Sequence, residues 1–291
     1  MPFAIPEYPD TAGITIEARP MLHPMFRERR DGVSEFTFAN IYLFRATHGY
    51  RLSQLRDGPV VITGSDEGQG GRSFFMLPFG LPSPESLRGL FEAFSFMKCV
   101  TEAQAAVLSG AGYRVEEDRD NFDYLYARED LSTLSGRRFH RKKNLVNFFT
   151  GHYNYVGKPL LGEYIEDALR VLDEWRDGRA GADADYEAAK EALLNCERLQ
   201  LCGGIYYVEG EPAAYTLGEE LTPDTFVIHF EKGLERYKGL LQFVNLSFAS
   251  LLTQRYSFIN REQDLGDPGL RKSKMSYKPA GFIKKYRASL P

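Results

Sequence analysis

The sequence predicts an α/β protein of the α+β type, made of two tandem modules that each hold a mixed, mostly antiparallel sheet flanked by helices. Strand-like and helix-like segments alternate in both halves of the 291 residues, and aromatic residues, 13% of the chain, supply material for the cores. The same order also occurs twice: a helix, a hairpin or meander, and then strand–helix–strand. Because the pattern restarts near residues 131–136, we expect an N-terminal module at 1–130 and a C-terminal module at 131–291.

The first module is expected to begin with a short alternating strand at 13–18 and a helix at 34–48, where apolar residues have helical spacing. Residues 50–65 should form a hairpin, because Asp57-Gly58-Pro59 is a turn sequence between two apolar runs. The remaining elements are a buried strand, two helices and a strand, at residues 74–80, 82–94, 102–113 and 122–127.

The second module is expected to begin with a basic helix, a strand and two further helices, at residues 136–149, 152–157, 162–178 and 184–200. Residues 203–232 predict a three-stranded meander, because turn sequences at 209–212 and 222–224 interrupt its apolar runs. A helix that is apolar nearly all round follows at 240–252, and another strand at 256–260.

Composition and charge exclude several classes of protein. Hydrophobic residues make up 43% of the chain and charged residues 26%, which is ordinary globular composition and argues against disorder. The net charge of −4 gives no overall attraction to nucleic acid, so such binding would need a local patch. Three cysteines without metal-like spacing and five scattered histidines predict no metal site and a reduced, cytoplasmic protein. We expect no signal peptide and no membrane-spanning segment.

The strand at 225–232 is expected to present two titratable groups together. His229 and Glu231 fall on one face of an alternating strand, opposite the core-facing Phe226, Ile228 and Phe230. The following turn holds Arg236, Lys238 and Gly239 at the start of the apolar helix, where unpaired N–H groups attract phosphate. The alternative is a strand–loop–helix corner whose charges face water and whose histidine is half-buried and satisfied.

Two further charged segments are candidate binding sites. One holds Asn260, Arg261, Glu262, Asp264, Arg271, Lys274 and Tyr277. Glu262 and Asp264 are expected to share a strand face and hold an ammonium group, while Arg271 and Lys274 present side by side to an anion. The other is a basic helix that suits a phosphate backbone or an anionic surface: Arg137, Arg138, His140, Arg141, Lys142 and Lys143. The alternatives are an internal ion-pair network for the first and a solvated helix face for the second.

Together these segments resemble the soluble catalytic domain of lysylphosphatidylglycerol synthases and the standalone bacterial proteins related to it. The resemblance covers most of the chain and is carried by the Asn195 helix and by residues 35–45, 124–144, 229–232, 237–245 and 259–279. It implies two tandem GNAT-type acyltransferase modules, with the active site in the second. It also implies transfer of an aminoacyl group from aminoacyl-tRNA to an amine or hydroxyl. Asn245, in the 237–245 motif, joins the candidate donor-binding residues.

The sequence departs from relatives of this kind in two ways. It lacks the membrane-spanning portion of the lipid-modifying enzymes, which leaves the acceptor open among small molecules, peptides and lipids, and the oligomeric state open as well. GNAT enzymes approach the pyrophosphate of acyl-CoA through a (Gln/Arg)-x-x-Gly-x-(Gly/Ala) loop. Here the loop reads Arg236-x-x-Gly239-x-Leu241, and the bulky leucine disfavours CoA.

Acyl transfer needs a neutral nucleophile, a stabilised oxyanion and a proton for the leaving oxygen. The candidate base is His229 or Glu231, and Tyr277 is the candidate acid. We expect no cofactor, with aminoacyl-tRNA as the co-substrate. The alternatives are an acyl-CoA donor on the same fold and a non-catalytic protein that holds RNA or an anionic membrane through its basic helix.

Overall fold

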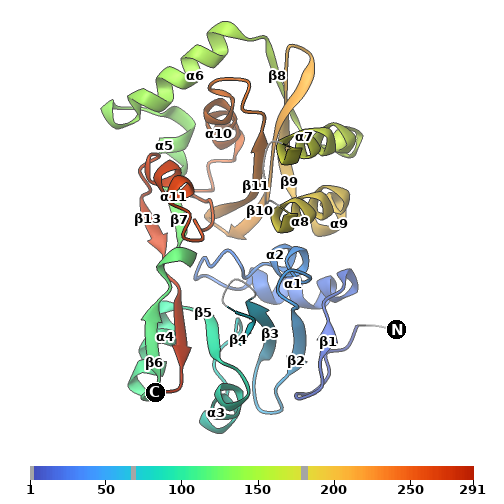
Figure 1. Cartoon of the computed structure of the whole chain (residues 1–291), viewed down its shortest axis with the longest axis vertical. Coiled ribbons are helices and arrows are strands. Elements are labelled where there is room, and N and C mark those ends of the chain that lie inside the picture. Colours follow the sequence, from blue (N-terminus) through green and yellow to red (C-terminus); the bar gives the residue numbers. More distant parts are fainter. Residues whose placement is uncertain (1–2, 67–69, 178–182) are drawn as a thin grey trace. The chain divides into compact units, whose positions relative to one another are not determined.

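A computed structural model describes residues 3–66, 70–177 and 183–291 of the chain (Figure 1). The chain divides into two compact units, each built on one seven-stranded sheet. Unit 1 contains Met1–Asp123 together with Ile283–Pro291, and unit 2 contains Tyr124–Phe282.

The elements of unit 1 are β1 (Ala12–Gly13), η1 (Ile16–Ala18), α1 (Arg19–Arg27), α2 (Phe38–Leu43), β2 (Arg51–Gln54), β3 (Val60–Asp66), β4 (Arg72–Met76), α3 (Pro84–Ala93), β5 (Phe96–Val100), α4 (Glu102–Gly110), β6 (Arg114–Glu117), η3 (Arg119–Asn121) and β14 (Tyr286–Ser289). Those of the second sheet and its helices are β7 (Asp123–Ala127), α5 (Arg128–Thr133), η4 (Arg137–Phe139), α6 (His140–His152), β8 (Tyr155–Pro159), η5 (Gly162–Tyr164), α7 (Ile165–Asp177), α8 (Asp183–Leu194), α9 (Cys196–Leu199), β9 (Cys202–Val208), β10 (Glu211–Thr222), β11 (Thr225–Gly233), α10 (Leu240–Leu251), β12 (Phe258–Asn260), α11 (Pro268–Met275) and β13 (Gly281–Ile283).

The two sheets repeat one plan. The first has the order β1-β2-β3-β4-β5-β14-β6, and the second, read in the same direction, β8-β9-β10-β11-β12-β7-β13. In each, a parallel pair is connected through a helix, as β4–α3–β5 and as β11–α10–β12, next to antiparallel neighbours. The predicted tandem of two related GNAT-like modules, each with a mixed and mostly antiparallel sheet, is thereby confirmed.

One strand of each sheet lies out of sequence order. β7 precedes the whole of the second half but lies between β12 and β13, while the C-terminal β14 lies between β5 and β6. Lys285, just before β14, is fully buried and bonded to Glu35 and Asp123 within unit 1. The division that the sequence suggested, after residue 130, therefore differs from the observed one by β7 and by the last nine residues.

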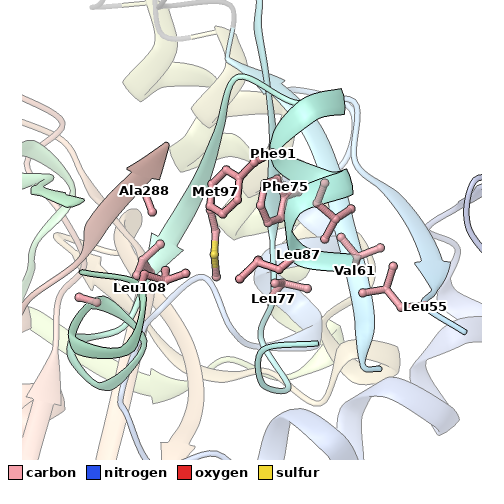
Figure 2. Close-up of a cluster of buried hydrophobic side chains, with 12 residues drawn as sticks. Leu55, Val61, Phe75, Leu77, Leu87, Phe91, Met97, Leu108 and Ala288 are labelled. Atoms are coloured by element: carbon pink, nitrogen blue, oxygen red, sulfur yellow. The ribbon is translucent and has the colours of Figure 1, made fainter. Parts of the chain in front are cut away.

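The core of unit 1 lies between one face of its sheet and helices α3 and α4 (Figure 2). Phe75 of β4 packs edge-on against Phe91 of α3, with ring centroids 5.0 Å apart. Met97 of β5 and Ala288 of β14 belong to the same buried cluster, so the C-terminal strand contributes directly to this core.

In unit 2, helices cover both faces of the sheet (Figure 1). On one face, α10 and α6 enclose a cluster that includes Ala214 of β10 and Phe243 of α10. On the other, Lys232 of β11 contacts the Trp175 ring of α7 and Asp185 of α8. Since α10 is buried between sheet and helices, its apolar character all round has a structural reason, as the sequence predicted.

Most predicted elements are present, with local differences. The strand expected at 13–18 is wrong, because only Ala12–Gly13 is extended and a 3-10 turn follows. The helix expected at 34–48 is limited to Phe38–Leu43. Helix α1 was not predicted, because its two prolines, one at the first turn and one inside, disguise the helical pattern. The expected end of the 162–178 helix falls on a residue outside the described part.

Candidate active site

The candidate active site lies where β11 and β12 separate. These strands pair in parallel over three residues only, because β12 ends at Asn260 whereas β11 continues to Gly233. Beyond the paired part, two side-chain pairs join β11 to the chain that follows β12: His229 with Glu262, and Glu231 with Arg261. The charged residues that the sequence singled out in two separate segments therefore meet.

A β-bulge in β11 determines how these side chains are directed. Residues 217 and 230 are paired, and residues 218 and 228 are paired, so His229 is an extra residue opposite β10. Such an insertion reverses the alternation of faces beyond it. Glu231 consequently shares the face of Phe226 and Ile228, toward α10, while His229 turns to Glu219 on the other face. The prediction that His229 and Glu231 share a face is wrong for this reason.

His229 is a buried imidazolium between two carboxylates. Its Nδ1 lies 2.8 Å from Glu262 Oε1 and its Nε2 lies 3.1 Å from Glu219 Oε1. Burial lowers the pKa of His229, but the hydrogen bonds and charges of Glu219 and Glu262 outweigh it and raise the pKa to about 10. With a proton on each nitrogen, the ring has no lone pair for a base. We therefore reassign His229 from candidate base to a residue that bridges β10 and the segment after β12.

The charge of His229 should make stability depend on pH. The pKa of about 10 in the folded protein lies above the ordinary value of 6.5, so the stabilisation is complete below 6.5 and is lost as pH rises through 10. We expect the free energy of unfolding of the wild type to exceed that of His229→Gln by a margin that shrinks between about pH 6 and about pH 10. Urea unfolding of both proteins across that range measures the margin, and a margin independent of pH would contradict the charged state.

Glu231 is held on one side only. Its Oε1 accepts a hydrogen bond of 2.9 Å from Arg261 Nη2, and the two side chains are 11% and 15% exposed. Its Oε2 is buried and has no hydrogen-bond partner among the described residues. A buried carboxylate oxygen without a donor is costly and uncommon in folded proteins. This oxygen is therefore available as a proton acceptor at the site.

Tyr277 lies near enough to this carboxylate for the charge of Glu231 to act on the pKa of its hydroxyl, and Lys142 lies over the Tyr277 ring. The Arg261 guanidinium is 5.2 Å and the Lys142 Nζ 4.0 Å from the centre of the Tyr277 ring. Burial raises the pKa of Tyr277 to about 12, so its hydroxyl keeps its proton at neutral pH. Burial and the nearby charge of Arg261 lower the pKa of Lys142 to about 8. The sequence placed Lys142 in a surface patch, and the structure turns it toward the site.

All hydrogen bonds shown for the carboxylate of Asp264 are to groups of the protein itself. It is fully buried and accepts hydrogen bonds from the Tyr124 hydroxyl, the Gly266 N–H and both Nε and Nη2 of Arg271. Although burial raises the pKa of Asp264, these bonds outweigh it and hold that pKa well below its usual range. The prediction that Glu262 and Asp264 share a strand face is wrong, because β12 ends at Asn260.

The turn after β12 is fixed by two polar side chains. Lys274 Nζ donates to the carbonyl oxygens of Arg261 and Gln263, each at 2.6 Å. The buried Asn260 accepts, through Oδ1, from the N–H of Glu262 at 2.8 Å. These contacts, like the Asp264–Arg271 pair, favour the internal-network interpretation of this segment. Its charges orient Arg261 and Glu262 toward β11.

Gly239, expected to let phosphate approach the start of α10, instead lets α6 approach. Its φ is +89°, and a Cβ there would lie 2.2 Å from the carbonyl oxygen of Leu145 and 3.1 Å from Cβ of Phe149. Only glycine fits such a close contact. The position explains the glycine without a ligand.

Arg236 and Lys238 also have partners in the protein. Arg236 forms an ion pair with Glu174 of α7, and Lys238 lies 4.5 Å over the Phe148 ring of α6. The structure therefore does not place these two side chains with Glu231 and Tyr277. A phosphate-binding role for the three residues at the start of α10 stays a prediction.

The basic helix divides into an exposed set and one inward residue. Five of its side chains are exposed: Arg137, Arg138, His140, Arg141 and Lys143. Arg138 pairs with Asp130, and Lys143 donates to the carbonyl of Thr133. Because these contacts leave the groups at the surface, the face keeps its positive charge.

Sequence reasoning missed two residues of this region. Glu219 of β10 is only 5% exposed, but in the sequence it stands between Gly218 and Glu220, so no local signal marks it as buried. Thr216 pairs with Glu231 across the sheet and has a buried hydroxyl without a partner among the described residues.

Among all residues that the structure describes, no group of three or more His, Cys, Asp or Glu is placed to hold a metal ion. No described helix is long and apolar enough to cross a bilayer.

Comparisons with known proteins agree with this architecture. A family model described as "Phosphatidylglycerol lysyltransferase, C-terminal" matches residues 26–289. A conserved protein of unknown function from Bacteroides thetaiotaomicron VPI-5482 has a crystal structure similar to this chain, with a TM-score of 0.86 and 30% identity over 97% of this chain and 99% of that one. The C-terminal domain (DUF2156) of a putative lysylphosphatidylglycerol synthetase from Agrobacterium fabrum matches with a TM-score of 0.61 and 13% identity over 94% and 90%.

Among curated proteins, an uncharacterized protein of Mycoplasmoides gallisepticum is 25% identical over 182 residues. That alignment covers 59% of this chain and 56% of the relative, so the chain spans little more than half of that protein's length. The family model, in contrast, covers nearly the whole chain, with every strand of the two sheets except β1. The chain belongs to the family described as phosphatidylglycerol lysyltransferase, C-terminal, which is a family of acyltransferases.

Proposed function

We propose that this protein transfers an aminoacyl group from aminoacyl-tRNA to an amine or hydroxyl acceptor. The observation that supports this most is the state of Glu231. Arg261 fixes one of its oxygens, and the other is buried and unpartnered among the described residues. A carboxylate held in this way can accept the proton of an attacking N–H or O–H. It does so where the two parallel strands diverge, in unit 2.

In the proposed reaction, the acceptor's nitrogen or oxygen attacks the ester carbonyl carbon, and its proton passes to Glu231. The carbonyl bond becomes a C–O⁻ group in a tetrahedral intermediate. When this collapses, the bond to the ribose oxygen breaks and that oxygen takes a proton, for which Tyr277 is the nearby donor. The raised pKa of Tyr277, about 12, keeps its proton available at neutral pH. Arg261 and Lys142 add positive charge where negative charge develops.

Three observations favour tRNA over CoA as the carrier of the acyl group. The side chain of Leu241, which replaces the small residue of the CoA-binding loop, lies against β11: its Cδ2 would be 2.8 Å from a Cβ at Gly233. The start of α10 is in contact with α6 at Gly239, which opposes the close approach of a pyrophosphate. The exposed basic residues of η4 and α6 supply a surface for an RNA backbone.

The direct test is incubation of the protein with a panel of charged tRNAs and acyl-CoAs, scoring loss of the acyl group from each donor. We expect deacylation of one or more aminoacyl-tRNAs and none of the acyl-CoAs. Micromolar binding of CoA in a calorimetric titration, with turnover of an acyl-CoA, would instead support the GNAT N-acyltransferase alternative. Salt-sensitive RNA binding without turnover of any donor would support a non-catalytic RNA-binding protein.

The basic surface can be tested separately by charge removal. Replacing Arg137, Arg141 and Lys143 together by serine should weaken tRNA binding and reduce the slope of log K against log salt by about 1 for each phosphate that is no longer neutralised. A matched control removes three exposed arginines of unit 1: Arg30, Arg56 and Arg88. Equal reduction of affinity in both triple variants would mean that the effect is one of net charge alone. Filter binding over a range of salt concentrations measures both slopes.

A further inference from the structure

Asn245 is an unusual residue for the middle of a buried helix. It lies in α10 and is 2% exposed, yet neither its Oδ1 nor its Nδ2 has a hydrogen-bond partner among the described residues. An apolar side chain of the same shape would avoid this loss of hydrogen bonds. Polar groups that destabilise a fold in this way are expected where function requires them.

Asn245 faces the part of β11 that carries Glu231. At the start of α10, Leu241 lies against Gly233, and further along the helix the Phe248 ring packs on Phe226, so α10 runs antiparallel to β11. From Leu241 to Asn245 the helix rises about 6 Å on one side. From Gly233 back to Glu231, on the same strand face, the distance is about 6.6 Å. The two residues therefore lie opposite each other between helix and sheet.

The unpartnered atoms of this region are of complementary kinds. Glu231 Oε2 is an acceptor, the Asn245 amide offers a donor and an acceptor, and the Thr216 hydroxyl offers both. Thr216 is the direct cross-strand partner of Glu231. A reacting acyl group needs the same set: an acceptor for the nucleophile's proton and a donor for the carbonyl oxygen.

The surrounding charges favour an oxyanion over a second cation. Arg261 already balances Glu231, and Lys142 lies over the same Tyr277 ring as Arg261, so an added ammonium would meet two positive groups. Developing negative charge would be stabilised by both of them. The amide donor of Asn245, Nδ2, is then the group that stabilises the oxyanion most directly.

We propose that Asn245 is a catalytic residue whose Nδ2–H₂ donates a hydrogen bond to the carbonyl oxygen of the acyl group. This role rests on the acyl transfer proposed above. As the nucleophile bonds to the carbonyl carbon, the π electrons of the C=O bond move to its oxygen, and Asn245 stabilises that oxygen until the ester C–O bond breaks. Glu231 holds the nucleophile's proton meanwhile. When the ester C–O bond breaks, its electron pair leaves with the ribose oxygen, which takes a proton from Tyr277, and the carbonyl C=O bond re-forms.

The test is Asn245→Leu, which keeps the shape and removes both polar atoms. Removal of one oxyanion donor should lower kcat by about 10²–10³-fold with little change in KM. Because the amide makes no hydrogen bond within the described protein, the midpoint of urea unfolding should stay the same or rise. Asn245→Asp is the second variant: it retains an oxygen but not the donor, and it should show the same decrease in kcat.

The matched control is Tyr215→Phe. The Tyr215 hydroxyl is also buried and unpartnered among the described residues, but it lies on the opposite face of β10, beside Lys232. Its removal should leave kcat unchanged and leave the unfolding midpoint unchanged or higher. A purely structural role for Asn245 predicts a lower midpoint in Asn245→Leu and an unchanged kcat per folded molecule, and either result would overturn the assignment. Absence of donor turnover by the wild type would overturn the proposed function, whereas wild-type turnover retained by both variants would overturn the Asn245 role alone.

Discussion

Glu231→Gln is expected to lower kcat for aminoacyl transfer by about 10²–10⁴-fold. The glutamine amide can still bond to Arg261 but cannot take a proton from the nucleophile. The measurement is single-turnover transfer from the donor identified in the deacylation panel. Glu235→Gln, at an exposed position in the loop between β11 and α10, makes the same chemical change and should retain full activity.

Two outcomes would contradict this role of Glu231. Full activity of Glu231→Gln would show that proton transfer does not pass through this carboxylate. An equal decrease in Glu235→Gln would show that the effect is one of charge on the whole unit. Circular dichroism of both variants checks that the fold is retained, since Arg261 keeps a hydrogen-bond acceptor in the variant at 231.

Gly239→Ala is expected to destabilise unit 2, because the position combines a positive φ with a close backbone contact. Its Cβ would overlap the carbonyl oxygen of Leu145, so α6 and α10 must move apart. Adopting positive φ costs an alanine about 1 kcal/mol or more, and overpacking adds about 1–3 kcal/mol. Urea unfolding measures the total.

Gly210→Ala separates the two contributions. Gly210 has φ +88°, nearly the same as Gly239, but a Cβ there would meet no atom within 4 Å. Its substitution should show the conformational cost alone. If both alanine variants were destabilised by the same free energy of unfolding, the contact between α6 and the start of α10 would have no energetic weight, and the interpretation of Gly239 as a packing residue would fail.

The parts of the fold that could be predicted are those written locally in the sequence. The meander of β9, β10 and β11 follows from alternation and from turn residues at Gly210 and Pro223, and the hairpin of β2 and β3 from Asp57-Gly58-Pro59. Helix α10 follows from a segment that is apolar nearly all round. Each of these signals lies within one helix or strand or in the turn next to it. Residue propensity and hydrophobic pattern are enough to predict such elements.

The parts that could not be predicted depend on pairing between distant segments. Nothing near His229 announces a bulge, because the extra residue is defined only by its register with β10. For the same reason the sequence put His229 and Glu231 on one face and missed Glu219. Lys142 looked like one more cation of a solvated helix, and only the position of Tyr277 distinguishes it from Lys143. The candidate residues were largely found, but their division of roles required the register.

The out-of-order positions of β7 and β14 affect how the chain can fold during its synthesis. Residues 3–117 emerge from the ribosome before the strand that separates β5 from β6, which is made only after all strands of the second sheet. The N-terminal unit must therefore leave a gap in its sheet, with the Glu35 and Asp123 carboxylates lacking their buried lysine, until Lys285 and the strand after it leave the exit tunnel. This protein therefore cannot fold vectorially, that is, with its N-terminal unit complete before the next unit starts to fold.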